Sequence, residues 1–346
     1  MHAAGKPRLA PGDIRLVVLE PGEMSDDIRC RLQRFSRQRA PAFEAVSYTW
    51  GDETRRQVVK YLDSPGRSCV ADSCASVLRR LRYTDRRRYI WIDALSINQQ
   101  DLKEHSVQVR MMPEIYSSAF KTIIYLGESA EDSDLTMCFL PFGQYHNMND
   151  STRIAIMRLF RRPWFERTWV IQEVAMSKSA EVLCGTMSAL WSSFAACAKI
   201  LSLQLLFFSL ISRLRKHSWM YIVTIDQFVK ALCDAAACRC RDPRDKIFAF
   251  VAMYLSMMNP SEIARYRESG MPMRRKRKQT SESDGPATKR VFIPGSPGSH
   301  LHCDVIDQKA TRDRISTDYS HSAETVFTEF ANILIENQGL DFLSAV

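Results

Sequence analysis

Three segments of the chain combine tryptophan, a carboxylate and small polar residues at the edge of an apolar run. They are Phe43–Asp52, Trp91–Gln99 and Arg162–Glu173. A charge in the middle of a core needs a partner, so acids and indoles that occur together are more typical of a pocket rim. An indole can stack on a planar ligand, and a carboxylate can hold its hydroxyls or stabilise a positive charge. These segments therefore predict a ligand pocket.

Local patterns place two of these segments at the ends of strands. Phe43–Tyr48 and Tyr89–Ile92 are short apolar runs bounded by polar residues, which is typical of buried strands. Gly51 permits a tight turn after the first run. In open α/β sheets the functional crevice lies beyond the carboxyl ends of the strands, so the polar residues after both runs should share one rim.

Strands and helices alternate from about residue 43 to residue 185, which predicts an α/β fold with a parallel sheet and helices on both faces. Further strands are expected at Ile14–Leu19, Val58–Leu62, Thr122–Leu126 and Glu181–Cys184, and helices at about 72–81, 109–119, 154–160 and 167–176. Pro113 conflicts with one continuous helix, so a kink or a fresh helix start near Met112 is expected. Asp26–Arg39 is polar and basic and should lie at the surface.

Taken in order, the three segments resemble the fungal heterokaryon incompatibility (HET) domain. The resemblance rests on Ser47-Tyr-Thr-Trp-Gly-Asp52, Trp91-Ile-Asp-Ala-Leu-Ser-Ile-Asn-Gln99 and Arg162-Pro-Trp-Phe-Glu-Arg-Thr-Trp-Val-Ile-Gln-Glu173. Supporting matches are Gln108–Ala119, Leu126-Gly127 and Cys184-Gly185, so the core match covers roughly residues 43–185. Arg241–Phe250 and Asp318–Ser320 resemble the region that commonly follows this domain.

The chain departs from the family pattern in a few places. Ser96 stands where the family usually has cysteine, which removes a soft nucleophile. A basic insertion at 272–290 is not typical of the family. Family members often continue beyond the last helix, so a truncated or short form stays open.

With this resemblance, the chain divides into five segments. We expect an N-terminal strand and basic surface segment (1–42), a HET domain (43–190), a mainly helical region (191–260), a basic, disordered insertion (261–320) and a C-terminal helix (321–346).

The family is associated with non-self recognition and programmed cell death in filamentous fungi. Its fold is thought to be similar to Toll/interleukin-1 receptor (TIR) domains, some of which cleave NAD. Trp169-Val-Ile-Gln-Glu173 resembles the TIR helix that bears a catalytic glutamate. The resemblance therefore implies a TIR- or flavodoxin-like sheet, no resident cofactor, and NAD as a candidate substrate.

Cleavage of nicotinamide from NAD builds positive charge on the ribose carbon, as in glycoside hydrolysis. The hypothesis is that Glu173 supplies the catalytic carboxylate, with Trp169 one turn earlier on the same helix face. The other expected ligand-binding residues are Ser47, Tyr48, Trp50, Asp52, Trp91, Asp93 and Asn98.

Plainer interpretations exist for the same residues. Glu173 could form a solvated ion pair with Arg167 or Lys178, and Trp91, Trp169 and Tyr48 could simply pack in a core. Asp93 could cap a helix or turn. The corresponding alternative function is a non-catalytic module of the same fold, which signals by assembling with other copies or with other incompatibility proteins.

Composition and charge bear on nucleic-acid binding and on the location of the protein in the cell. The net charge of +9 gathers in clusters such as Arg29–Arg39 and Arg79–Arg88, but no aromatic residues are interleaved as in nucleic-acid modules, so nucleic-acid binding is a third and weaker interpretation. Arg274–Lys278 with Lys289-Arg290 resembles a bipartite nuclear-import signal or is a solvated loop, which leaves the cytoplasm or the nucleus as the location.

Several site types find no support in the sequence. The ten cysteines lack paired spacing, which indicates reduced thiols, and Cys233, Cys238 and Cys240 lack a second cluster that would complete a zinc site. The apolar run Ile200–Ile211 is too short to span a bilayer, so no membrane association is expected. There is no Gly-rich dinucleotide motif, P-loop or nucleophile elbow, and histidines such as His105 are isolated.

Overall fold

The computed structural model describes residues 6, 8–52, 54–63, 67–143, 148–203, 205–217, 231–235, 238–257 and 318–338. The basic insertion expected at 261–320 therefore lies outside the described residues up to residue 317. The two basic clusters that resemble a nuclear-import signal fall within that stretch.

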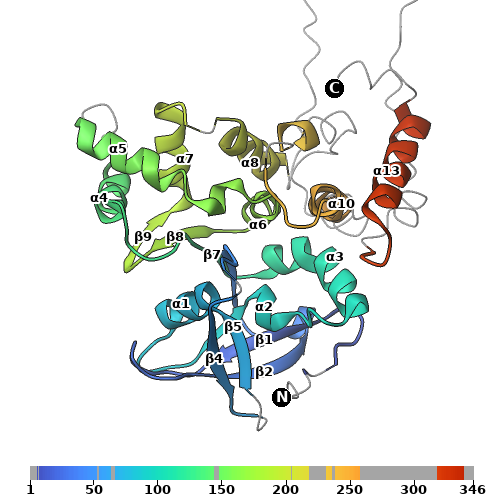
Figure 1. Ribbon diagram of the computed structural model, residues 1–346, viewed down its shortest axis with the longest axis horizontal. Helices are drawn as coiled ribbons and strands as arrows, with labels where there is room; N and C mark the ends of the chain where they lie inside the picture. Colours follow the sequence, from blue (N-terminus) through green and yellow to red (C-terminus); the bar gives the residue numbers. More distant parts are fainter. Residues whose placement is uncertain are drawn as a thin grey trace, which may run out of the picture.

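One nine-stranded sheet runs through the described part of the chain, in the order β5-β4-β2-β1-β6-β3-β7-β8-β9 (Figure 1). Its strands are β1 (Asp13–Leu19), β2 (Ile28–Ser36), β3 (Glu44–Tyr48), β4 (Arg56–Tyr61), β5 (Arg67–Ala71), β6 (Arg88–Trp91), β7 (Lys121–Tyr125), β8 (Ala180–Cys184) and β9 (Met187–Leu190). Strands β6, β3, β7 and β8 pair in parallel. Numbered along the chain, they have the order second, first, third, fourth, which also occurs in flavodoxin-like sheets.

Antiparallel strands extend this parallel centre on both sides. Strand β1 is inserted between β2 and β6 and is antiparallel to both, and β9 is antiparallel to β8. The α/β class is confirmed, but the sheet is mixed rather than parallel throughout. The N-terminal strand is thus an integral part of the sheet that carries the HET-like segments.

The segment expected to be a basic surface stretch contains strand β2. From Ile28 to Gln33 buried and more exposed residues alternate: Ile28, Cys30 and Leu32 are buried, whereas Arg29 and Gln33 are exposed. This is the period of two that a half-buried strand requires. The arginines between the apolar residues hid the alternation in the sequence.

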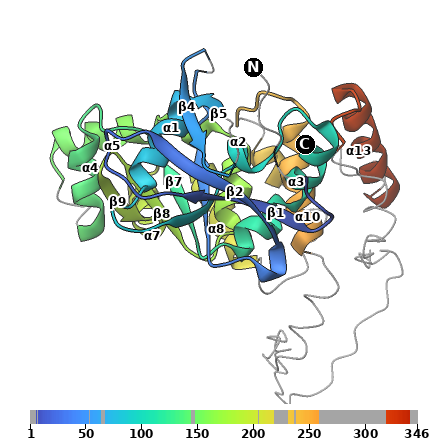
Figure 2. The same ribbon diagram turned by 90° about the horizontal axis from the view of Figure 1, so that it is seen from below.

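Helices cover both faces of the sheet. They are α1 (Asp72–Leu81), α2 (Asp93–Ser96), α3 (Leu102–Ser118), α4 (Ser133–Phe139), α5 (Asp150–Leu159), α6 (Trp169–Ala175), α7 (Trp191–Ile200), α8 (Leu205–His217), α10 (Asp245–Met257) and α13 (Ala323–Gln338). Helix α1 packs on β4 and β5, and its residues belong to a different buried cluster from those of α3 and α6. Helix α10 packs on α3 and α6, with α13 at the outer edge beside it (Figures 1 and 2).

Helix α3 is continuous through Pro113, so the expected break near Met112 is absent. Proline removes one backbone donor and crowds the preceding turn. Here the proline is buried, and the helix begins at a strong cap, because the Asp101 side chain accepts hydrogen bonds from the amides of Lys103 and Glu104. Packing and capping therefore outweigh the local cost of Pro113.

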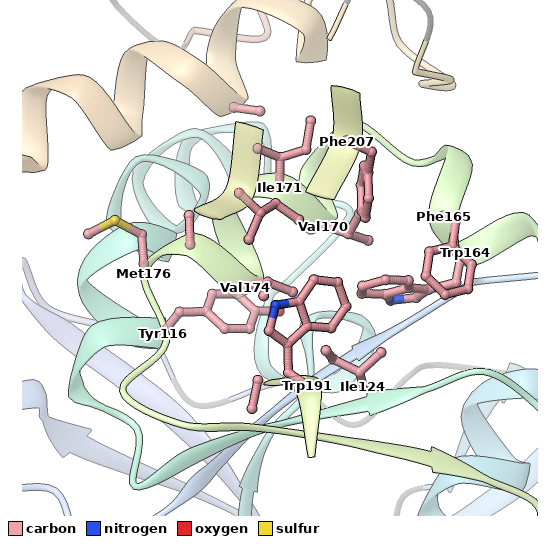
Figure 3. Packing of buried hydrophobic residues seen from close by; sticks show 14 of the residues in the cluster. Tyr116, Ile124, Trp164, Phe165, Val170, Ile171, Val174, Met176, Trp191 and Phe207 are labelled. Carbon is pink, nitrogen blue, oxygen red and sulfur yellow. The ribbon is translucent and has the colours of Figure 1, made fainter. Parts of the chain in front are cut away.

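Helix α6 sits in an aromatic core (Figure 3). Its residues from Val170 to Ala175 are all buried. Trp164, just before the helix, packs edge to face against Trp191 at 6.0 Å and against Phe207 at 6.2 Å between ring centroids. Such close packing fixes the helix, and with it any side chain that α6 directs toward the sheet.

Among the described residues, every helix falls short of the length and apolar character that a bilayer crossing requires.

Candidate functional site

A cavity of about 870 Å3 lies where β3 and β6 end. It is lined by the turn after β3, by α2 and the turn that follows it, by α3, by the start of α6, by residues 239–245 and by Tyr319. Its volume lies within the range of roughly 300–1,000 Å3 that is usual for small-molecule sites. The expected crevice beyond the strand ends is therefore present.

Glu173 lies at the inner end of this cavity and is only 2% exposed. The Ser47 hydroxyl donates a hydrogen bond to Glu173 Oε2, and Trp164 Nε1 donates one to Ser47 Oγ at 2.8 Å. Arg167 Nη2 is 4.0 Å from Glu173 Oε1. The carboxylate is thus held by a relay of two hydrogen bonds on one side and by a guanidinium on the other.

Burial raises the pKa of Glu173 to about 7. The positive charge of Arg167 and the hydrogen bond from Ser47 oppose this rise, and the negative charge of Asp93 adds to it. The group can therefore be either protonated or ionised near neutral pH, as acid–base catalysis and control of charge both require.

Trp50 and Asp93 form a second unit of the site. Trp50 Nε1 donates a hydrogen bond of 2.8 Å to Asp93 Oδ2, while Asp93 Oδ1 accepts one of 2.7 Å from the amide of Ala94. Burial raises the pKa of Asp93, against the effects of Arg167 and Trp50. Gly51 has a φ of +69°, which lets the chain turn sharply after the indole. Asp93 thereby fixes the plane of the Trp50 ring.

The opposite wall repeats this arrangement with residues from distant parts of the chain. Asp245 accepts a hydrogen bond of 2.7 Å from the hydroxyl of Tyr319, and the neighbouring Trp169 indole favours its ionised form. The ring of Tyr319 packs against His105 at 4.5 Å between centroids. Burial raises the pKa of Asp245. A partly buried indole with a carboxylate beside it therefore stands on each wall.

Arginines hold the wall segments together. Arg167 Nη1 donates to the carbonyl of Tyr48, and the amide of Thr168 donates to the carbonyl of Arg239 at 3.0 Å. Arg244 binds both carboxylate oxygens of Asp242 and donates to the carbonyl of Tyr319 at 2.8 Å. Residues 239–245 are thereby fixed to the start of α6 and to the segment before α13.

Four of the residues predicted from the sequence meet in this cavity. Trp50, Asp93, Trp169 and Glu173 all line it. Ser47 belongs to the same site through its bond to Glu173. The ion pair with Arg167, proposed as the plainer role of Glu173, is present, but it is buried rather than solvated.

The other four predicted residues lie outside the cavity lining. Trp91 is fully buried and packs edge to face on Tyr116 at 5.6 Å, and Tyr48 is buried in the cluster on the other face, so the packing alternative describes both. Asp52 is exposed and hydrogen-bonds to Thr54. The Asn98 side chain accepts from the amide of Gln100.

Ser96, which replaces the usual cysteine of the family, is also buried away from the cavity. Its hydroxyl accepts a hydrogen bond of 3.1 Å from the amide of Ile92 and so helps to hold the turn into α2.

Sequence reasoning did not assign Arg167, His105, Asp245 or Tyr319 to the site. Arg167 could have been found, because it lies between Trp164 and Trp169 in a segment already singled out. Asp245 and Tyr319 lie in the two later motifs, Arg241–Phe250 and Asp318–Ser320. Nothing in the sequence shows that these motifs pack against the first wall, which is the wall formed by Trp50, Asp93 and Glu173.

Part of the cavity lining falls within a segment that matches a known family. Residues 43–173 match the family described as heterokaryon incompatibility protein (HET). These residues form a HET domain. The match includes the relay to Glu173 and the Trp50–Asp93 pair, whereas residues 239–245 and Tyr319 of the second wall lie beyond the HET match.

A curated protein is similar to a longer part of the chain. The chain is 30% identical over 226 residues to a protein of Neurospora crassa named heterokaryon incompatibility protein 6, OR allele. The similarity covers 50% of this chain and 33% of the relative, so the chain spans about a third of that relative's length. No solved structure matches the chain.

Metal ligands do not gather in the described part of the HET-domain chain. No group of three or more His, Cys, Asp or Glu residues there is placed to hold a metal ion. Cys233 is exposed, and Cys238 and Cys240 are partly buried free thiols.

Proposed function

We propose that this HET-domain chain acts in fungal non-self recognition and programmed cell death, and that it does so by cleaving NAD in the cavity at Glu173. The first part is supported by the HET match and by the name of the Neurospora relative. The order of β6, β3, β7 and β8 supports the TIR-like part of the proposal, since flavodoxin-like sheets share it.

The observation that carries the enzymatic proposal is the setting of Glu173. A carboxylate buried on a packed helix is costly unless it is paired, and this one is oriented by Ser47 toward a cavity large enough for a nucleotide. Trp50 and Trp169 offer aromatic faces to that cavity, and a dinucleotide carries two planar rings.

In the proposed cleavage of NAD, the negative charge of Glu173 stabilises the positive charge that develops on the ribose. The bond between the ribose C1′ and the nicotinamide nitrogen breaks, and its electron pair leaves with neutral nicotinamide. Positive charge on the ribose is stabilised by ionised Glu173. Water then adds to C1′ and loses a proton, which gives ADP-ribose, nicotinamide and a proton. The rate should rise as the pH increases through about 7, because the ionised carboxylate is required.

The test compares wild-type protein with Glu173→Gln, which keeps the shape and a hydrogen-bond acceptor for Ser47. Nicotinamide release from NAD is measured at several protein concentrations, because self-association could be needed for activity. We expect release by the wild type and none by the variant.

A parallel test expresses both proteins in a fungal cell and scores cell death and NAD content. If neither protein cleaves NAD and both remain toxic and assemble, the enzymatic proposal is refuted. The non-catalytic signalling module then replaces it.

A further inference from the structure

The cavity places indole rings beside carboxylates. Trp50 and Trp169 line it from opposite walls, and both are partly buried. Asp93 accepts a hydrogen bond from Trp50 Nε1, and Asp245 lies beside the indole of Trp169. An N–H group that donates to a carboxylate is polarised and leaves more electron density on its ring. The face of such an indole attracts a cation more strongly, and tryptophan is already the best aromatic partner for a cation.

The carboxylate of Glu173 has one oxygen that is open to a ligand. Its Oε2 accepts a hydrogen bond from Ser47, whereas Oε1 lies 4.0 Å from Arg167 Nη2, which is too long for a hydrogen bond. Among the described residues no other donor serves Oε1. Because Glu173 is only 2% exposed and lines the cavity, a positively charged ligand there can supply the missing partner.

Apolar side chains form another part of the lining. Ile97, Val109 and Met112 are buried and line the same cavity. Attraction between a cation and an aromatic face is stronger where water is removed, and so is the attraction between opposite charges. A planar cation would thus find aromatic faces, a carboxylate and little competing water in one place.

The positive groups of the lining leave Glu173 incompletely neutralised. The lining holds four arginines, which are Arg167, Arg239, Arg241 and Arg244. Arg244 is bound to both oxygens of Asp242, and Arg239 is exposed, so solvent screens its charge. Of the four, Arg167 is the one that lowers the pKa of Glu173, and it does so without a hydrogen bond.

We propose that this part of the cavity binds a planar aromatic cation, which in NAD is the oxidised pyridinium ring, against the indole faces of Trp50 and Trp169 and beside Glu173. This rests on the proposed function, because it names the part of NAD that lies next to the reacting ribose. The ring is bonded directly to the ribose carbon, so a ribose held at Glu173 brings the ring to the same end of the cavity. The reduced ring of NADH has gained a hydride and is neutral, so the cavity selects the oxidised form.

A proton on Glu173 competes with such a cation. Burial raises the pKa of Glu173 to about 7, so the ionised fraction falls from about nine-tenths at pH 8 to about one-tenth at pH 6. A cation that requires the ionised form should therefore bind roughly tenfold more weakly at pH 6.

Other groups near Glu173 bear on this pH dependence. The titratable or charged groups of the packed elements and of the shared lining are Lys6, Asp93, His105, Tyr116, Arg167 and Asp245. Burial lowers the pKa of Lys6 to about 8 and also lowers that of His105. Both gain positive charge as the pH falls, which weakens cation binding in the same direction. The variant Glu173→Gln separates their contribution from that of Glu173.

Binding of 1-methylnicotinamide and of nicotinamide tests the site without any turnover. The two probes share the ring and the carboxamide, but only the first carries a fixed positive charge. NMR titration of the full chain at pH 6, 7 and 8 measures both dissociation constants. We expect the wild type at pH 8 to bind 1-methylnicotinamide about tenfold or more tightly than nicotinamide.

Variants assign this preference to the proposed groups. Glu173→Gln should lose most of the preference and most of its pH dependence. Trp169→Leu should also lose most of the preference, whereas Trp169→Phe keeps a weaker aromatic face and should retain part of it. Asp52→Asn is the matched control, because it removes an exposed acid close to Trp50 in sequence but outside the cavity lining, and it should keep the full preference.

Each alternative outcome has a distinct meaning. No binding of 1-methylnicotinamide to the wild type, equal affinity for the two probes, or a preference that persists in Glu173→Gln with the same pH dependence would overturn the cation site. Failure of the proposed reaction alone gives another pattern, in which NAD is not cleaved but the preference and its loss in the variants are intact. Cleavage of NAD together with equal affinity for the two probes refutes the cation site and leaves the reaction standing.

Discussion

At the scale of single residues, the burial of Glu173 makes ionisation of its carboxyl cost free energy of folding. Burial raises the pKa of the Glu173 carboxyl to about 7 in the folded protein, whereas a glutamate in an unfolded chain has the ordinary pKa of 4.5. Between these values the folded protein binds more protons than the unfolded chain. The stability contributed by the protonated group is therefore complete below about pH 4.5 and is lost as the pH rises to about 7.

Glu173→Gln should consequently stabilise the protein at high pH. The neutral amide cannot ionise, so at pH 8 the free energy of unfolding should rise by on the order of 1–3 kcal/mol, with little gain near pH 5. Chemical denaturation of both proteins from pH 5 to pH 8 measures this. A difference that stays constant across the range would show that the carboxyl titrates normally.

Trp50 should act on Asp93 through its indole nitrogen alone. Trp50→Phe keeps an aromatic face but removes the donor to Asp93, which should cost about 1–2 kcal/mol and raise the pKa of Asp93 further. A double-mutant cycle with Asp93→Asn measures the coupling between the two side chains. Strictly additive effects would mean that the hydrogen bond does not contribute.

At the scale of elements, Glu104 joins α3 to the sheet. It binds Arg15, which is fully buried on β1, through both carboxylate oxygens, and it accepts a hydrogen bond of 2.7 Å from the amide of Asn98. Arg15 also donates to the carbonyl of Ser96 at 2.7 Å. One ion pair thus fixes β1, the turn after α2 and the first turn of α3, three elements on which the inner half of the cavity depends.

Glu104→Ala should therefore destabilise strongly, by about 3–5 kcal/mol, because it leaves a buried guanidinium without its carboxylate. The matched control is Asp85→Ala, which removes the partner of exposed Arg86 and should change the unfolding free energy by less than about 0.5 kcal/mol. Urea denaturation compares the two, and similar losses would argue against the special role of the Arg15–Glu104 pair.

Tyr319 couples the segment before α13 to α10. Its hydroxyl binds Asp245, its carbonyl accepts from Arg244, and its ring packs on Phe248 at 5.0 Å between centroids. Tyr319→Phe keeps the ring contacts and removes only the hydroxyl. We expect faster hydrogen exchange over α13 and at the start of α10, with α1 unchanged.

Tyr89→Phe is the control for this measurement, since the ring of Tyr89 packs on Phe35 away from the cavity. Unchanged exchange over α13 in the Tyr319 variant would mean that the ring contacts alone hold this segment.

At the scale of the whole molecule, the distribution of thiols reports how the chain is packed. Four described cysteines are buried: Cys30, Cys74, Cys184 and Cys197. Three are exposed: Cys69, Cys138 and Cys233. Burial also raises the pKa of Cys30, Cys74 and Cys197 to about 12, so these thiols hold little reactive thiolate at pH 8.

Brief labelling of the native protein with a thiol reagent should therefore modify the exposed group first and the buried group only after denaturation. Peptide mass spectrometry identifies each site. Rapid native labelling of Cys74 or Cys197 would contradict the packing of α1 or α7 described above.

Sequence patterns predicted the parallel centre of the sheet and the inner half of the site. Trp50 and Asp93 directly follow short apolar strands, and Glu173 lies on a helix in a distinctive motif, so local order was sufficient. The second wall is made by long-range packing, because Asp245 and Tyr319 reach Trp169 only through the fold. Trp91 was predicted to bind a ligand but is buried in the core. The sequence could not show this, because a tryptophan next to a pocket motif is found in the same sequence pattern whether its ring faces the ligand or the core.

The two walls of the cavity lie far apart in the order of synthesis. A ribosome releases Glu173 and its relay long before it makes Tyr319, and until Asp245 and Tyr319 dock, Trp169 lacks the contacts that orient it. A chain that ends before Tyr319, because it is unfinished or has been cleaved, contains Glu173 but lacks one wall of the cavity that encloses it. For a protein proposed to kill its own cell, the complete cavity is therefore absent until Tyr319 has been made.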